Sequence, residues 1–184
     1  MVHESNKGII RVEDTVMSFE SIYNETYFPK ELLNEISKAN MLIIPEYFIR
    51  ENFSEYVFPE TTREFLEYAK EQASDDFVPD IAADDDCFNK LELHSAVVTI
   101  ATFIVTSVVF PIALSVIANF LTDEIRKHHR KEDELTAKIN IIITNDKGNG
   151  NKKISYEGPA GSAEEALKLA VQGIFKDDGD NNGN

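Results

Sequence analysis

Four aspartates near the middle of the chain are the first candidates for metal binding. Asp84, Asp85 and Asp86 are consecutive, and Asp80 precedes them closely. Neighbouring carboxylates gain most when they share a hard divalent cation such as Ca²⁺ or Mg²⁺. The spacing, however, lacks the glycine at position six and the glutamate at position twelve of a calcium-binding loop. The pattern therefore favours a solvated acidic loop, and no metal site is predicted.

Glu92 and His94 could form an acid/base pair, because residues two apart on a strand project from the same face. The sequence shows no third residue that would orient this pair. Cys87 and the four histidines have no spacing typical of zinc ligands. We therefore predict no catalytic residue and no cofactor. An enzyme that uses the 84–86 aspartates, or Glu92 with His94, remains as an alternative.

The composition is that of a globular protein with an acidic balance. Of the 184 residues, 42% are apolar and 28% are charged, which excludes wholesale disorder. The net charge of -15 repels phosphate backbones, so nucleic-acid binding is not expected. Only the acidic tail, residues 176–184, is predicted to be disordered.

An apolar run dominates the elements that would position these residues. Residues 93–122 contain no Asp, Glu, Lys or Arg, and about 20 such residues suffice to span a membrane. A basic flank follows, formed by Arg126, Lys127, Arg130 and Lys131. It predicts contact with anionic lipids and, by the positive-inside rule, a cytoplasmic C-terminal part. The orientation stays open, because 92 residues would then have to cross the membrane.

Small hydroxyl side chains recur within the apolar run. Ser95, Thr99, Thr102 and Thr106 follow one another at steps of four, three and four, which predicts one face of a helix that self-associates. The alternative is a buried helix, or two shorter helices bent at Pro111. A second copy of the chain could cover such a helix, and the protein would then be a soluble homo-oligomer.

The C-terminal part is predicted to be a β-hairpin followed by a helix, a ββα unit. Ile139, Ile141 and Ile143 alternate with other residues as in a strand, and a loop rich in Gly and Asn leads to a second strand at 152–157. Ser162 and Glu165 have the spacing of a capping box that begins a helix reaching to residue 175.

The N-terminal part is predicted to form a small α/β layer with at least one parallel strand pair. Helices are expected at 29–39 and 61–72, and strands at 41–45, 77–82 and, more weakly, 8–12. The fold class is therefore α+β. We expect an N-terminal domain at 1–92, the apolar helix with its basic flank at 93–131, and the ββα unit at 132–175.

The order of elements from Ala96 onward resembles one known family. A long apolar helix with a basic end at 126–131, a strand at 139–143, a charged hairpin, a second strand and a helix at 164–175 are similar to the effector-associated constant component proteins of bacterial conflict systems. The resemblance implies an accessory role beside effectors in anti-phage defence, without catalytic residues.

These observations together predict a non-enzymatic adaptor of a bacterial cell. It would associate with the membrane through a transmembrane helix at 93–122 and otherwise be cytoplasmic. The unpaired edge of its hairpin calls for a partner strand, from the N-terminal part or from another molecule. In the adaptor hypothesis, the ββα unit would bind a partner protein by this strand-edge pairing.

Overall fold

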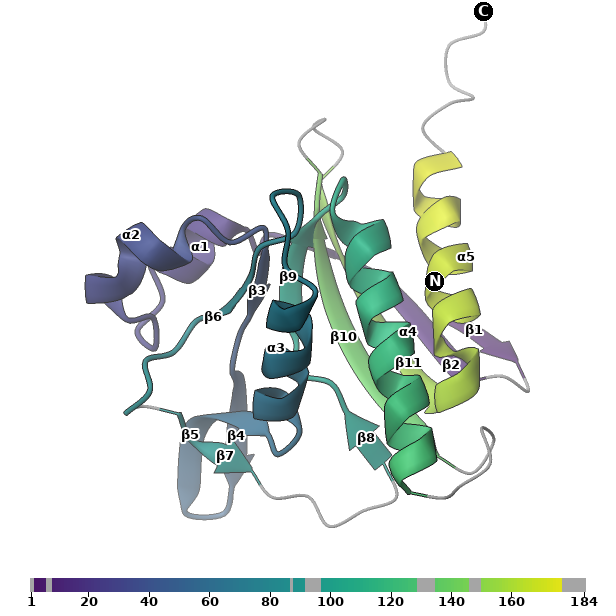
Figure 1. Cartoon of the computed structure of the whole chain (residues 1–184), viewed down its shortest axis with the longest axis horizontal. Coiled ribbons are helices and arrows are strands. Elements are labelled where there is room, and N and C mark those ends of the chain that lie inside the picture. The colour runs from purple at the N-terminus through teal and green to yellow at the C-terminus, as the bar shows by residue number, and fades with distance from the viewer. Residues whose placement is uncertain are drawn as a thin grey trace, which may run out of the picture.

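The computed structural model describes residues 2–5, 8–86, 88–91, 97–128, 135–145 and 150–176. The described residues form a mixed α+β fold with one large sheet, a smaller sheet and five α-helices, as Figure 1 shows. The predicted α+β class is therefore confirmed. The predicted tail lies outside the described residues from 177 onward.

The large sheet has eight strands in the order β1-β2-β11-β10-β9-β3-β6, and β8 pairs with β10 beside β9. The central strands β10 and β9 are parallel to each other, whereas β3 is antiparallel to β9 and parallel to β6. The strands are β1 (Val2–Ser5), β2 (Gly8–Thr15), β3 (Met41–Ile43), β6 (Pro79–Ile81), β8 (Val97–Thr99), β9 (Phe103–Thr106), β10 (Thr136–Thr144) and β11 (Asn151–Pro159).

The smaller sheet has the order β4-β5-β7 and projects from the rest of the molecule at one corner (Figure 1). It consists of β4 (Glu46–Arg50), β5 (Phe53–Pro59) and β7 (Lys90–Leu91). Strands β4 and β5 form an antiparallel hairpin, and β7 pairs only with the last two residues of β5. Most of the hairpin therefore extends beyond the third strand.

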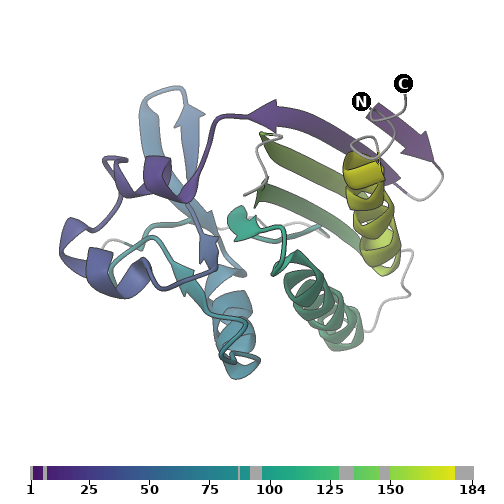
Figure 2. The same cartoon turned by 90° about the horizontal axis from the view of Figure 1, so that it is seen from above.

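Helices cover the large sheet on both faces, but unequally. Three helices, α3 (Thr62–Glu71), α4 (Phe110–Lys127) and α5 (Ala163–Lys176), lie side by side on one face (Figures 1 and 2). Two short helices, α1 (Phe19–Tyr23) and α2 (Leu33–Ile36), cover part of the other face. A short 3-10 helix precedes each of two α-helices. These are η1 (Lys30–Leu32) before α2 and η2 (Ala160–Ser162) before α5.

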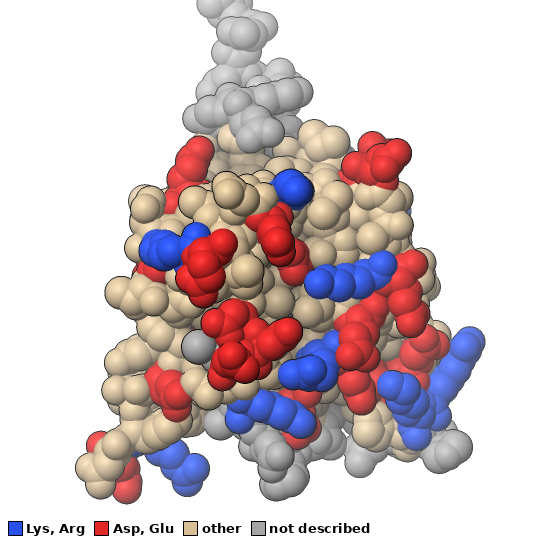
Figure 3. Space-filling model, turned by 60° about the vertical axis from the view of Figure 1, so that its left-hand side comes forward, with Lys and Arg blue, Asp and Glu red and all other residues tan. Residues whose placement is uncertain are grey.

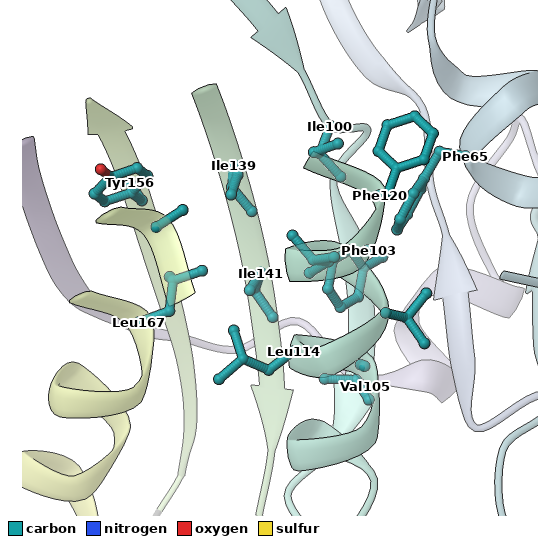
Figure 4. Close-up of a cluster of buried hydrophobic side chains, with 14 of the residues drawn as sticks. Phe65, Ile100, Phe103, Val105, Leu114, Phe120, Ile139, Ile141, Tyr156 and Leu167 are labelled. Carbon is teal, nitrogen blue, oxygen red and sulfur yellow. The ribbon is translucent and has the colours of Figure 1, made fainter. Parts of the chain in front are cut away.

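The larger core fills the space between the sheet and the three long helices. Phe65 of α3, Phe120 of α4 and Leu167 of α5 belong to one buried cluster with the strand residues Phe103 and Ile141, as Figure 4 shows. The neighbouring strand residues point to the opposite face, because side chains alternate along a strand. There they form the second, smaller core with α1 and α2, which contains Ile22, Ile36, Leu42, Ile104 and Ile142.

The expected membrane span is wrong, because the apolar run does not form one helix. Within residues 93–122, the described part forms β8, β9 and the first three turns of α4. Among the described residues, no helix has the length and apolarity needed to cross a membrane. The alternative, in which the run is buried core, fits better, and the cover comes from this chain's own sheet and helices.

The physical reason is that central strands and membrane helices look alike in sequence. A strand covered on both faces is apolar at every position rather than at alternate positions. Ile104 and Val105 of β9 are therefore both fully buried, although they face opposite cores. Pro111 then stands in the first turn of α4, where a helix needs no backbone N–H donor, so it starts a helix instead of bending one.

The ββα unit forms as predicted in its elements, but its edges are already paired. Strands β10 and β11 are antiparallel and α5 follows, with Ile141 and Leu167 in one core. Strand β11 pairs with β2 on its other side, and β10 pairs with β8 and β9. The expectation that this hairpin binds a partner by edge pairing is therefore wrong.

Gly8, at the start of β2, has to be a glycine. Its φ of 119° is rare for residues that carry a side chain. A Cβ at this position would lie 2.9 Å from Cε2 of Tyr156 on β11. The absence of a side chain thus lets the N-terminal strand join the C-terminal hairpin.

The N-terminal elements agree with expectation in kind more than in extent. Strands β3 and β6 are parallel neighbours, as predicted. The helix expected at 29–39 is reduced to η1 and α2. Thr61 does not cap α3 with its side chain, because its hydroxyl donates a hydrogen bond to the carbonyl oxygen of Thr99 at 2.6 Å.

Candidate functional site

Three of the four hydroxyl residues expected on one helix face, Thr99, Thr102 and Thr106, are not on a helix. Thr99 ends β8, Thr106 ends β9, and Thr102 lies between these strands, while Ser95 is outside the described residues. Thr102 is buried, and its Oγ1 donates a hydrogen bond to Oε1 of Glu46 at 2.5 Å. The geometry on which helix self-association rested is therefore absent.

Two residues of the basic flank, Arg126 and Lys127, lie in the last turn of α4, whereas Arg130 and Lys131 are outside the described residues. Lys127 Nζ is 2.9 Å from Oε1 of Glu124 and 3.7 Å from Oε2 of Glu64 on α3. The hydrogen bond with Glu124 is the main reason why the pKa of Lys127 is raised. Both cations complement the helix dipole, and Lys127 links α4 to α3.

The carboxylate of Glu124 is buried at the same end of α4. Its residue is only 4% exposed, and Oε2 lies 3.4 Å from Nε2 of His128. Lys127 and His128 thus approach the two oxygens of one buried carboxylate, which is the arrangement that a buried charge requires.

The acidic loop holds its aspartates with bonds inside the chain. Oδ1 of Asp84 accepts a hydrogen bond from the backbone N–H of Asp86 at 2.6 Å, and Asp80 forms an ion pair with Lys70 at 3.2 Å. Within the described ranges, no group of three His, Cys, Asp or Glu side chains could hold a metal ion. Cys87, Glu92 and His94 lie outside the described residues. The acid/base pair that the sequence suggested at Glu92 and His94 therefore stays untested.

The surface feature best suited to binding is the β4-β5 hairpin, which sequence patterns did not single out. Tyr47 is 55% exposed, Ile49 is 73% exposed and Phe53 is 48% exposed. Tyr47 and Ile49 project from one face of the hairpin, because they are two residues apart on β4. Phe53 lies opposite Arg50 and projects from the other face. Both faces of this hairpin therefore present large apolar side chains to solvent.

Three tyrosines stabilise the face that carries Tyr47 and Ile49. Tyr56 of β5 is the cross-strand neighbour of Tyr47, and their ring centroids are 5.0 Å apart. The ring of Tyr27, from the loop after α1, packs on Tyr56 at 4.7 Å. Burial is the main reason why the pKa of Tyr27 is raised. The tilted rings favour a fixed hairpin orientation.

The hairpin closes with a two-residue loop of uncommon composition. Arg50 pairs with Phe53, so Glu51 and Asn52 form the loop. Glu51 has a φ of 24°, a conformation that costs energy for residues other than glycine. A sequence search for Asn-Gly or Asp-Gly turns passes over this loop. The detectable signal was the frequency of aromatic and β-branched residues between 47 and 58.

Charge on the surface is mixed rather than separated. On the face in Figure 3, Lys and Arg side chains lie among the more numerous Asp and Glu side chains. The hairpin follows the same pattern, because Glu46 and Arg50 stand at opposite ends of β4 and both are exposed.

Comparison with known proteins gives no relative for this chain. No family model, no curated protein and no solved structure matches it.

Proposed function

We propose that the protein is a non-enzymatic accessory protein that binds a partner protein through the β4-β5 hairpin. The observation that carries this proposal is the exposure of Tyr47, Ile49 and Phe53 on two faces of one projecting hairpin. Two-stranded hairpins are only marginally stable in water unless another layer covers them. Tyrosine and other aromatic residues are also enriched in the cores of protein interfaces.

The alternative explanation, scattered surface hydrophobic residues, fits other parts of the chain better. Val16 and Val108 are exposed single residues between elements, and Leu169 is a single exposed residue on α5, which is normal for a protein surface. The hairpin differs because its apolar residues are adjacent and held by the tyrosine cluster. Adjacent exposed apolar groups mark interaction sites more often than single ones.

An accessory role of this kind also agrees with the resemblance of the C-terminal half to effector-associated constant component proteins. The defence context stays a prediction that rests on this resemblance. The hairpin lies outside the resembling half, so the resemblance names no partner for it.

The test is site-specific cross-linking with a photo-reactive phenylalanine analogue. The analogue replaces Ile49 in one sample and Leu169 in a control sample, because Leu169 is similarly exposed but lies on α5. Each full-length protein is irradiated in an extract of the cells that encode it. We expect a discrete protein adduct from position 49 and none from position 169.

A second experiment measures the same surface by loss of binding. Tyr47→Ser with Ile49→Ser should weaken partner binding at least tenfold, because central aromatic residues dominate interface energies. Leu169→Ser should leave it unchanged. Equal adducts from both positions, or binding that survives the double substitution, would show that the hairpin is not the interface.

A further inference from the structure

We propose that the partner is a second copy of this chain, joined to the first by antiparallel pairing of the two β4 strands. The inference rests on the proposed function, because it identifies the occupant of the same hairpin. The two-fold axis would pass beside Phe48, and the two hairpins would form one four-stranded sheet.

The first argument is that β4 offers a free strand edge. Strand β4 ends the order β4-β5-β7, and no described segment pairs with its outer side. In an antiparallel hairpin with a two-residue loop, the pair that flanks the loop is hydrogen-bonded, and the bonding alternates from there. Arg50 and Phe53 are that pair. The N–H and C=O groups of Tyr47 and Ile49 therefore point away from β5.

The second argument is register. An axis at Phe48 places Tyr47 opposite Ile49 of the partner subunit, and both residues direct their backbone groups outward. Such a pair exchanges two hydrogen bonds, and symmetry doubles the number. An axis at Tyr47 would instead place Ile49 opposite the partner's Pro45, which has no N–H to donate. An axis at Ile49 would use Glu51, which has the φ of a turn residue.

The third argument is charge. In the register centred on Phe48, Glu46 lies opposite Arg50 of the partner subunit, and Arg50 lies opposite the partner subunit's Glu46. Opposite charges in directly facing positions stabilise antiparallel pairs, and like charges destabilise them. Both side chains are exposed, and they project from the same face of β4. The strand is thus complementary to its own antiparallel copy.

The fourth argument is the position of the edge. In Figure 2, the hairpin stands clear of the three long helices and of most of the large sheet. Pairing along β4 turns each hairpin tip toward the body of the other subunit without moving the elements that form either core. Tyr47 and Ile49 of both subunits would then form one apolar strip beside Tyr56.

The experiment is a charge-swap series on the full-length chain, measured by analytical ultracentrifugation over a range of protein concentrations. The parent should show a concentration-dependent dimer. Arg50→Glu and Glu46→Lys should each weaken dimerisation at least tenfold, because each places like charges opposite one another twice per dimer. An equimolar mixture of the two variants should form a heterodimer, since both facing pairs are then opposite in charge.

A second variant keeps the test decisive if Glu46→Lys does not fold, since Glu46 also accepts the hydrogen bond from Thr102. Ile49→Pro removes an N–H that points away from β5, so it should abolish the dimer while circular dichroism stays that of the parent. Dimers that persist in Arg50→Glu and Ile49→Pro would overturn the inference.

Failure of this inference differs from failure of the proposed function. At about 1 mM, only very weak complexes remain dissociated. A parent chain that is still monomeric at this concentration overturns self-pairing. If position 49 then cross-links to another protein, the hairpin remains a binding site with a different occupant. If position 49 cross-links to nothing, both proposals fail.

Discussion

Leu167→Ala tests whether the fold is one cooperative unit. Leu167 is fully buried in the same core as Phe103 of β9 (Figure 4). This core also contains Ile10 of β2. Burying a leucine side chain contributes about 1.5 to 3 kcal/mol. The cavity left by truncation raises the total cost to about 2 to 5 kcal/mol. This is a large part of the roughly 5 to 15 kcal/mol that stabilises an ordinary domain.

The assay is urea denaturation followed by far-ultraviolet circular dichroism and by tyrosine fluorescence, because the chain has six tyrosines and no tryptophan. Leu169→Ala is the matched control. Leu169 lies on the same helix and is 60% exposed, so its truncation should change stability by less than about 0.5 kcal/mol. Both signals should shift together in Leu167→Ala.

Two separate transitions, of which only one shifts, would refute this reasoning. They would show that residues 132–175 fold independently, as the division into 1–92, 93–131 and 132–175 supposes. A single shifted transition would show that β2 and the ββα unit unfold together.

Two further predictions concern buried side chains. Val105→Arg should destabilise the protein by about 3 to 5 kcal/mol, because it leaves an unpaired charge in central strand β9, and Val108→Arg, at an 80% exposed position, should change thermal unfolding little. Burial raises the pKa of Tyr156 from 10.0 to about 12, so its contribution to stability is complete below pH 10 and is lost as pH rises through about 12. Tyr156→Phe should therefore flatten the loss of stability in that window. At neutral pH it should cost about 0.5 to 1.5 kcal/mol, since the hydroxyl donates a hydrogen bond to the carbonyl oxygen of Pro159 at 2.7 Å; chemical denaturation at a series of pH values measures both effects, and an unchanged alkaline slope would contradict the pKa argument.

Local patterns predicted several elements correctly. Strand β10, the helix α5 and the parallel strands β3 and β6 follow from alternation, helical periodicity and turn residues. The interpretation failed at β9, because a strand covered on both faces loses the alternation that identifies it. Strand β8 and the start of α4 lengthened the same apolar run. Composition alone does not distinguish such strands from a membrane helix.

The candidate site was less predictable than the fold. The proposed binding role of Tyr47 and Ile49 rests on their exposure and on a free strand edge, and both are properties of tertiary structure. Sequence reasoning left open whether an N-terminal strand or another molecule would pair with the edge of the ββα unit, and the structure shows that β2 occupies it. The prediction of helix self-association through the hydroxyl residues failed for a related reason, since their spacing places them on one face only if they lie on a helix.

The pairing of β2 with β11 also determines when the protein can finish folding in the cell. Ile9 pairs with Glu157, so a strand made at the start of translation waits for one made near its end. At about 5 to 20 residues per second, this delay is roughly 7 to 30 s. During that time the nascent chain exposes unpaired strands, which in the later part of the delay include the apolar segments that become β8 and β9. Ribosome-bound intermediates of this protein should therefore depend strongly on chaperones that shield extended apolar segments.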